Sequence, residues 1–278
     1  MKKMLASIAL ISAIPASVFA GNIYLTGHDV DLHDGQNGYD NVIVDYLRDG
    51  RTAPTYSIAV IGSGIGYWGW TDVPGFGDRG SKPGYGATTF YDTDTMNEAD
   101  WDAALSHSLL EITSFVTCGG CDLDGNGVDV INAHSSKIQS AFNAGMDIWG
   151  NSAATSATYY NFLPPSAVAT GAPIDGSSGF TATPAGVGIG ILPTQINGFP
   201  THNRFASSAS VFTVMETRGE EIISLGLKGG RIACPEGTTP PDCTPIIIIT
   251  PAVPEPSTFG LMGLGLALVG FIGRRRKK

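Results

Sequence analysis

Apolar positions in the first part of the chain change between the spacing of a strand and that of a helix. An apolar run at residues 22–26 precedes a polar loop, and residues 39–50 then carry apolar side chains on one helical face. A β-rich run follows at residues 55–64. The order strand, helix, strand favours a parallel sheet with a crossover helix.

The alternation continues through the middle of the chain. It predicts a helix over 96–108 and a strand over 111–118, then a helix over 128–145, a strand over 146–152 and two terminal strands over 210–219 and 220–233. Asp94 or Thr95 is the expected cap of the first of these helices.

Two Gly-rich stretches interrupt the pattern. Residues 62–95 read as a long surface loop, and residues 164–200 read as an insertion. The sequence therefore predicts one α/β domain over 21–233, with a mostly parallel sheet, flanking helices and Gly/Pro-rich loop insertions.

Residues 1–20 read as a secretory signal peptide. Lys2 and Lys3 precede an apolar run, and Ser17 to Ala20 place small residues three before and at the expected cut. A membrane anchor is the alternative, but the run is shorter than the roughly 20 residues that a spanning helix needs. The mature chain is expected to start at Gly21.

The C-terminal residues combine a proline-rich segment, an apolar run and a basic cluster. Residues 253–256 read Val-Pro-Glu-Pro, residues 257–273 carry no charge, and the five residues after them are all Arg or Lys. The uncharged run reaches the lower limit for crossing a bilayer, about 17 residues, and the basic cluster fits the cytoplasmic side. A single transmembrane helix is expected over 257–273.

In this order the three parts resemble the PEP-CTERM protein-sorting signal, over residues 253–278. The resemblance implies recognition by a membrane peptidase of the exosortase type, with cleavage near Pro254, Glu255 and Pro256, in bacteria that make exopolysaccharide. Both prolines fix φ and remove a donor, so the segment is extended where a peptidase grips its substrate. An ordinary membrane anchor is the alternative.

The charge of the chain is divided unevenly. Seven of the 16 Lys+Arg lie in the two ends, so residues 21–256 set 9 of them against all 25 Asp+Glu, a formal net charge near −16. Nucleic acid is excluded as a partner because its phosphates need a basic surface. Cations are the more suitable partners.

Four cysteines lie in two local pairs on a chain that is expected to reach an oxidising compartment, which favours disulfides. Cys234 and Cys243 are expected to close a Pro/Thr-rich loop within a linker over 234–252. For Cys118 and Cys121 a structural disulfide, a redox pair, a metal site and a lone nucleophile are open. The loop-like sequence after them favours the disulfide.

Three stretches carry a resemblance to a fold family: 23–29 as first strand and loop, a strand running into 117–120, and 142–150 as helix, Gly stop and strand. They resemble the class I glutamine amidotransferase-like family, which implies a flavodoxin-like layout. A glutaminase of that family needs a cysteine nucleophile after a strand and a late His-x-Glu. Cys118 imitates the first, but the residues after His202 depart from the second. Glutaminase activity is not expected, although Cys118 and His202 remain the catalytic candidates.

Five residues of the first loop suit a cation: His28, Asp29, Asp31, His33 and Asp34. In an extended loop Asp29, Asp31 and His33 share one face, and imidazole with carboxylate suits zinc, manganese or iron. A divalent transition-metal site, a ligand-binding loop without metal and a solvated turn are open.

Asp122, Asp124 and Asn126, with Gly127, match the first half of a calcium-binding loop. The twelfth position is Ala133, where that motif has a bidentate Glu. A Ca²⁺ site and an Asx-type turn are the two interpretations.

Tyr67, Trp68 and Trp70 offer rings for stacking on a sugar or for packing a loop onto the body. With the sorting signal, they favour a structural or binding protein of the cell envelope, associated with exopolysaccharide or the cell surface. Signal peptidase, an exosortase and polysaccharide are the expected partners. The alternatives are an extracellular metal-dependent hydrolase or other enzyme with its site at residues 26–38, and a calcium-dependent adhesin.

Overall fold

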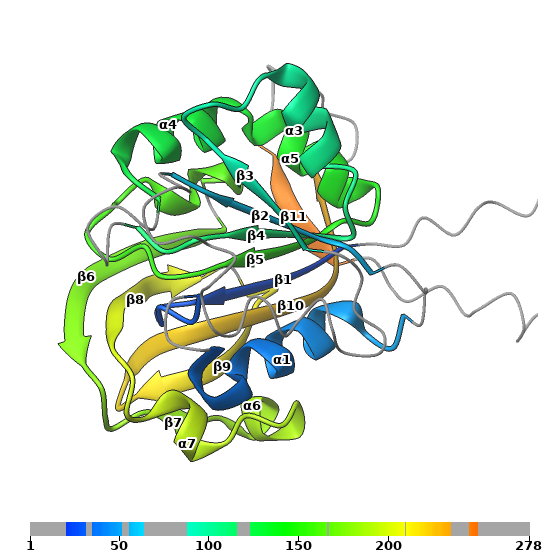
Figure 1. The fold of residues 1–278 in the computed structure, drawn as a ribbon. Helices are drawn as coiled ribbons and strands as arrows, with labels where there is room; N and C mark the ends of the chain where they lie inside the picture. The colour runs from blue at the N-terminus through cyan, green and yellow to red at the C-terminus, as the bar shows by residue number, and fades with distance from the viewer. Residues whose placement is uncertain are drawn as a thin grey trace, which may run out of the picture. The chain divides into compact units, whose positions relative to one another are not determined.

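The computed structural model describes residues 21–31, 35–51, 56–63, 88–115, 123–165, 167–208, 210–234 and 245–249. The chain divides into two units, residues 1–18 with 252–278 and residues 19–251, and every described residue lies in the second. This unit is a mixed α/β sheet with helices on both faces (Figure 1).

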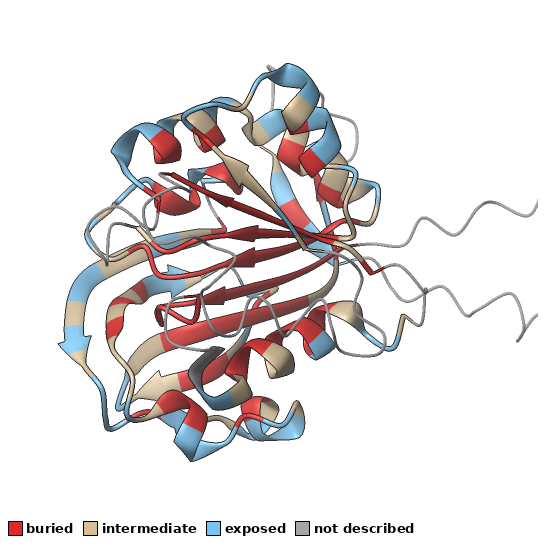
Figure 2. Cartoon of the chain, in the orientation of Figure 1, coloured by how far each residue is buried: buried red, intermediate tan, exposed pale blue. Residues whose placement is uncertain are grey.

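Five parallel strands form one half of the sheet. In spatial order they are β3 (Thr88–Asp92), β2 (Ile58–Gly62), β4 (Leu109–Ile112), β5 (Asp147–Gly150) and β1 (Gly21–Thr26). All but β3 are buried over their whole length (Figure 2), which accounts for their nearly continuous apolar sequences. Because the strands are parallel, their carboxyl ends meet at one edge of the sheet.

Antiparallel strands form the other half, so the predicted mostly parallel sheet is wrong. β10 (Glu221–Ala233) pairs with β1, and β8 (Thr201–Ser208) and β6 (Val168–Gly176) follow outward. β9 (Thr213–Arg218) and β11 (Ile246–Ile249) also pair with β10, and β7 (Thr181–Ala182) pairs with β9. The cause is the β9–β10 hairpin: its turn at Gly219, with φ +61°, is too short for a parallel crossover.

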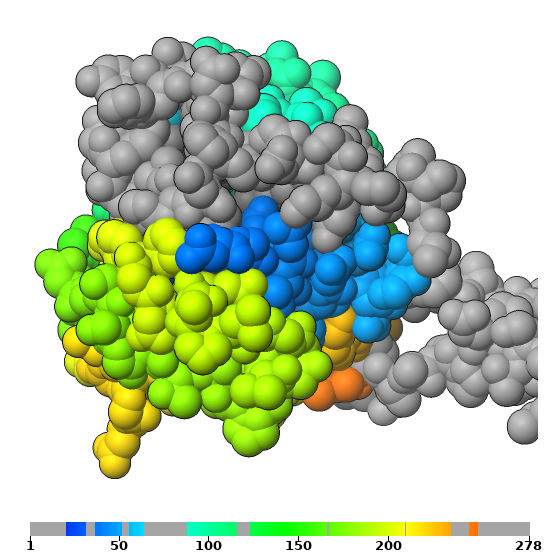
Figure 3. Space-filling model, turned by 60° about the horizontal axis from the view of Figure 1, so that its bottom comes forward, coloured from blue at the N-terminus to red at the C-terminus, as the bar shows by residue number. Residues whose placement is uncertain are grey.

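Period-two alternation divides the core between the two faces. Ile23 and Leu25 of β1 pack on one face with α3 (Glu98–Ala104), α4 (Gly125–Ala133) and α5 (Ser135–Asn143). Tyr24 points to the other face and packs with α1 (Gly35–Arg48). α6 (Pro184–Gly188) and α7 (Pro193–Ile196) lie on the α1 side, and Figure 3 shows this segment beside α1.

Two helix predictions are corrected by the structure. The helix expected over 128–145 is two helices, because His134 between them, with φ −97° and ψ 10°, leaves helical geometry. The cap of α3 is Asn97 rather than Asp94 or Thr95, and its side-chain oxygen accepts two backbone N–H groups of the first turn.

Several strands lie in segments that the sequence pattern assigned to loops. β3 lies inside the Gly-rich stretch 62–95, β6 and β7 lie inside 164–200, and β11 lies inside 234–252. Gly171, Pro173 and Gly176 weaken the strand signal of β6 because none of them favours a paired strand interior. The stretch 164–200 therefore supplies part of the sheet.

Among the described residues, no helix is both long enough and apolar enough to cross a bilayer. The predicted signal peptide and the predicted membrane helix over 257–273 lie outside those residues.

A buried carboxylate lies at the amino end of β5. Asp147 accepts hydrogen bonds from the backbone N–H of Asn22 at 2.8 Å, from the hydroxyl of Tyr56 at 2.5 Å and from the guanidinium of Arg51. Burial raises the pKa of Asp147 to about 6, and these bonds lower it only in part.

This raised pKa predicts a pH dependence of stability. Between about pH 4 and pH 6 folded Asp147 holds a proton that the unfolded chain has released, so its contribution to stability falls as pH rises through this window. We expect the unfolding free energy of the wild type, minus that of Asp147→Asn, to be about 3 kcal/mol larger at pH 4 than at pH 7, an order-of-magnitude figure. Urea unfolding at both pH values measures it, and equal differences would contradict the assignment.

Candidate functional site

The carboxyl edge of the parallel strands carries a row of polar side chains on the α1 face. One position beyond the paired residues Ile112 and Gly150 lie Thr113 and Asn151, and Thr26 of β1 pairs with Ser224 of β10. The loops after the carboxyl ends of strands are where α/β sheets bind ligands. The described residues of the first loop, His28, Asp29 and Asp31, lie at the same edge.

His28 is buried at this edge, and both of its ring nitrogens have a hydrogen-bond partner. Its Nε2 donates to Glu216 at 2.7 Å, and its Nδ1 is 2.7 Å from the Thr201 hydroxyl. Both members of the His28–Glu216 pair have no exposed side-chain surface. Glu216 also accepts hydrogen bonds from Ser224 at 2.9 Å and from Tyr39 at 3.3 Å. The pair therefore joins the first loop to β8, β9, β10 and α1.

Two tyrosines complete this polar cluster. The hydroxyls of Tyr24 and Tyr39 are 2.8 Å apart, and burial raises the pKa of both, aided for each by the nearby charge of Glu216. Both phenols stay protonated at neutral pH. They serve as hydrogen-bond donors in the core rather than as bases.

Asp31 joins the loop after β1 to the loop after β4. Its two oxygens accept from the backbone N–H of Ser114 at 2.9 Å and from the Ser114 hydroxyl at 2.8 Å, and both residues are buried. This use of both oxygens is typical of a structural carboxylate.

Asp29 and His202 form the part of the edge that reaches solvent. Asp29 Oδ2 is 3.7 Å from His202 Nε2, and the exposed carboxylate of Asp175 is 3.9 Å from His202 Nδ1. The His202 side chain is 23 % exposed, whereas that of Asp29 is 2 % exposed. The structure thus brings a first-loop aspartate and the later histidine candidate together.

The backbone carbonyls at this edge are occupied by the protein itself. The short 3-10 helix η2 (Tyr159–Phe162) places the Tyr159 hydroxyl 2.7 Å from the Thr113 carbonyl oxygen. The Tyr160 hydroxyl is 2.8 Å from the Asn151 carbonyl oxygen and 3.2 Å from that of Thr26. These bonds close the edge from the face opposite α1.

Among the described residues, two buried side-chain oxygens of the polar row have no hydrogen-bond partner: Thr113 Oγ1 and Asn151 Oδ1. Both residues have no exposed surface. A buried polar atom left unsatisfied costs about 1–3 kcal/mol, so a hydrogen-bond donor from a ligand or from bound water would stabilise these two oxygens.

The residues of the half calcium loop take local roles. Asp124 caps α4 by accepting from the backbone N–H of Gly127 at 2.7 Å and from the Ser63 hydroxyl at 3.1 Å. Asn126 donates to Asp94 at 3.3 Å. Asp122 lies outside the described residues.

Several other candidates also lie outside the described residues: His33, Asp34, Tyr67, Trp68, Trp70, Cys118, Cys121, Cys243, Pro254, Glu255 and Pro256. Cys234, at the end of β10, is disulfide-bonded. Its pairing with Cys243 stays a prediction. In the described part of the chain, no three or more His, Cys, Asp or Glu side chains gather closely enough to hold a metal.

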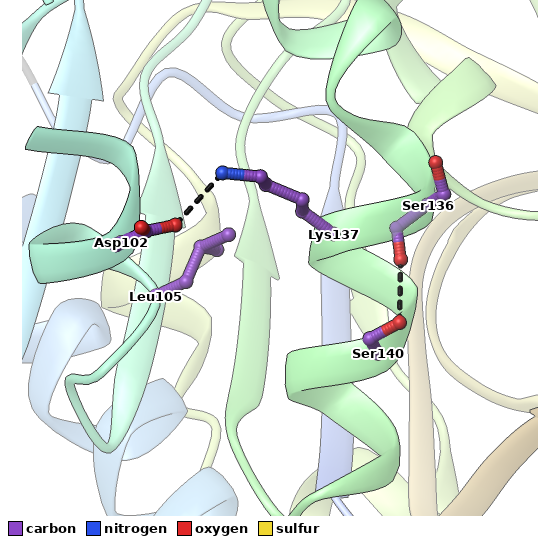
Figure 4. A pocket seen from close by; sticks show the side chains of 5 residues that line it. All are labelled: Asp102, Leu105, Ser136, Lys137 and Ser140. Carbon is purple, nitrogen blue, oxygen red and sulfur yellow. Dashed lines mark hydrogen bonds and ion pairs between the residues drawn. The ribbon is translucent and has the colours of Figure 1, made fainter. Parts of the chain in front are cut away.

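A surface pocket of about 390 Å³ lies away from this edge, between α3 and α5. Figure 4 shows Lys137 reaching across it to Asp102 at 2.7 Å, with Leu105 beneath and Ser136 and Ser140 on α5. No local sequence pattern predicts this pocket, because its residues come from two helices that each have an ordinary polar outer face.

The comparison with protein families finds one match. Residues 252–277 match the model of the PEP-CTERM protein-sorting motif. This confirms the resemblance of the C-terminal residues, and it marks the chain as an exported protein that is membrane-anchored before processing and recognised by an exosortase. No curated protein and no solved structure matches the chain.

Proposed function

We propose that the exported domain is a binding component of the cell surface or of its exopolysaccharide, delivered by the PEP-CTERM signal. The formal charge near −16 of residues 21–256 is consistent with a hydrated extracellular role and unsuited to nucleic acid. The signal peptide over 1–20 and a signal peptidase belong to the same proposal.

One observation carries the binding role. At the carboxyl edge, the side chains of His28 and Asp31 form hydrogen bonds within the protein through all their polar atoms. By contrast, Thr113 Oγ1 and Asn151 Oδ1 are buried and have no hydrogen-bond partner among the described residues. Unsatisfied acceptor oxygens that follow two neighbouring strands suit the hydroxyl groups of a sugar, which donate hydrogen bonds. The pattern supports recognition more than proton transfer.

The test uses Thr113→Val, which keeps the shape and removes one open oxygen. We expect about tenfold weaker retention in the exopolysaccharide fraction, with the unliganded domain as stable or more stable, because an unsatisfied hydroxyl has been removed. The exposed Thr89→Val on β3 is the matched control. Co-sedimentation of secreted protein with polysaccharide measures retention. Equal retention of all three proteins would contradict the proposal.

A metal-dependent hydrolase is the second candidate, favoured by the solvent-reaching Asp29–His202 pair. The metal content of the same secreted sample, prepared without chelator, distinguishes the two. Near-stoichiometric transition metal that is lost in His202→Ala would favour the hydrolase. His202 suits this test because it is partly exposed, whereas removing His28 would disturb the core.

A further inference from the structure

Strand β11 presents an apolar strip at the surface. Ile246, Ile248 and Ile249 are 37 %, 38 % and 51 % exposed, whereas Ile247 is buried in the core that includes Phe142. Among the strands that the structure describes, β11 pairs with β10 alone. Figure 3 shows β11, in orange, at the surface beyond the end of α1.

A positive charge accompanies the isoleucines. Arg231 of β10 is exposed and lies directly opposite Ile248, so the two side chains point to the same side of the sheet. Ile246 shares that side by period-two alternation. Apolar side chains beside an arginine suit the boundary between lipid headgroups and acyl chains.

The sorting signal holds this strip close to a bilayer. The matched motif begins at residue 252, after only Thr250 and Pro251. The apolar run starts at Ser257, so residues 250–256 span at most about 25 Å even when fully extended. While the chain is anchored, β11 therefore lies within that distance of the bilayer.

We propose that β11 and Arg231 form a lipid-contacting strip that seats the domain on the membrane until the signal is cleaved. The inference rests on the membrane anchoring that the sorting motif indicates and not on the binding role of the carboxyl edge. The acidic remainder of the domain disfavours other orientations on anionic lipid. A second copy of the chain is the weaker occupant, because a four-residue strand offers far less than the ~1,200 Å² of a stable interface.

The test uses the full chain in vesicles of phosphatidylethanolamine and phosphatidylglycerol that carry a photoactivatable group near the lipid headgroup. Only chains that float with the vesicles are compared. We expect lipid crosslinks in residues 245–249 and few in 184–196, where Val187 and Leu192 are 62 % and 55 % exposed but lie far before the sorting motif in the sequence. Ile248→Glu should lower the crosslink yield at 245–249 about fivefold, and Val187→Glu should leave it unchanged.

Two results would contradict the proposal that this strip contacts lipid. Equal yields in 245–249 and 184–196 would mean that the domain does not sit on β11. Crosslinks between chains at residues 245–249 that replace lipid crosslinks as protein density rises would assign the strip to a second copy. Because the test reads lipid contact, its failure is separable from failure of the polysaccharide proposal.

Discussion

Replacing Glu216 by alanine is expected to lower the free energy of unfolding by about 3–5 kcal/mol. The change leaves His28 buried opposite no acceptor, and it also removes the acceptor of Ser224 and Tyr39. Breaking a buried pair from one side costs this much because the remaining polar group cannot return to water. Denaturant unfolding of the exported domain measures the loss.

Two controls make the result specific to the pair. Glu220→Ala, four residues further along in the exposed β9–β10 turn, should change stability by less than about 0.5 kcal/mol. In the double variant with His28→Leu, the loss should be clearly smaller than the sum of the two single losses. Additive losses would show that His28 and Glu216 are not coupled and that this pair does not hold the first loop to the β9–β10 hairpin.

This pair shows what the sequence was able to predict and what it was not. The predicted order of strand, loop and helix places the first loop after the carboxyl end of a strand, and the structure has it there, between β1 and α1. The partner of His28 lies 188 residues away on β9, which docks only once the hairpin pairs with β1 through β10. No local pattern carries that information, and the polar loop alone suggests a metal ligand at His28.

The strands of the sheet divide in the same way, into those that a local sequence pattern predicts and those that depend on residues far away in the chain. Four of the five parallel strands are buried on both faces, and such strands are recognisable in the sequence as apolar runs. β8 was not predicted because its inward residues include Thr201 and Asn203, polar side chains that are buried only because the core supplies their partners. β3, which forms the outer edge of the parallel half, alternates weakly and follows a Gly-rich stretch.

Asn203 also explains why the candidate edge needs a glycine. Its side-chain oxygen accepts from Ser152 at 3.0 Å and from the backbone N–H of Ala153 at 2.8 Å, which ties β8 to the loop after β5. Its backbone oxygen lies so near Gly27 that a Cβ there would be 2.0 Å away. The backbone N–H of Gly27 donates a hydrogen bond to the carbonyl of Ile223, and the Gly27 carbonyl accepts one from the backbone N–H of His202.

Gly27→Ala is therefore expected to cost about 3 kcal/mol or more, or to prevent folding. The clash is with backbone, so no side-chain rotation relieves it, and moving β8 away breaks the bonds of Asn203 and separates His202 from Asp29. Gly125→Ala is the matched control, because a Cβ there meets nothing within 4 Å and α4 gains a better helix former.

Thermal unfolding of the two variants beside the wild type decides the point. A melting temperature for Gly27→Ala within a degree or two of the wild type would mean that β8 can move away from residue 27 at little energetic cost. The polar edge would then be a movable surface rather than a fixed one, and the placement of Thr113 and Asn151 opposite a ligand would lose its physical basis. A large loss confined to Gly27→Ala would show that close contact between the first loop and β8 fixes the geometry on which recognition at this edge depends.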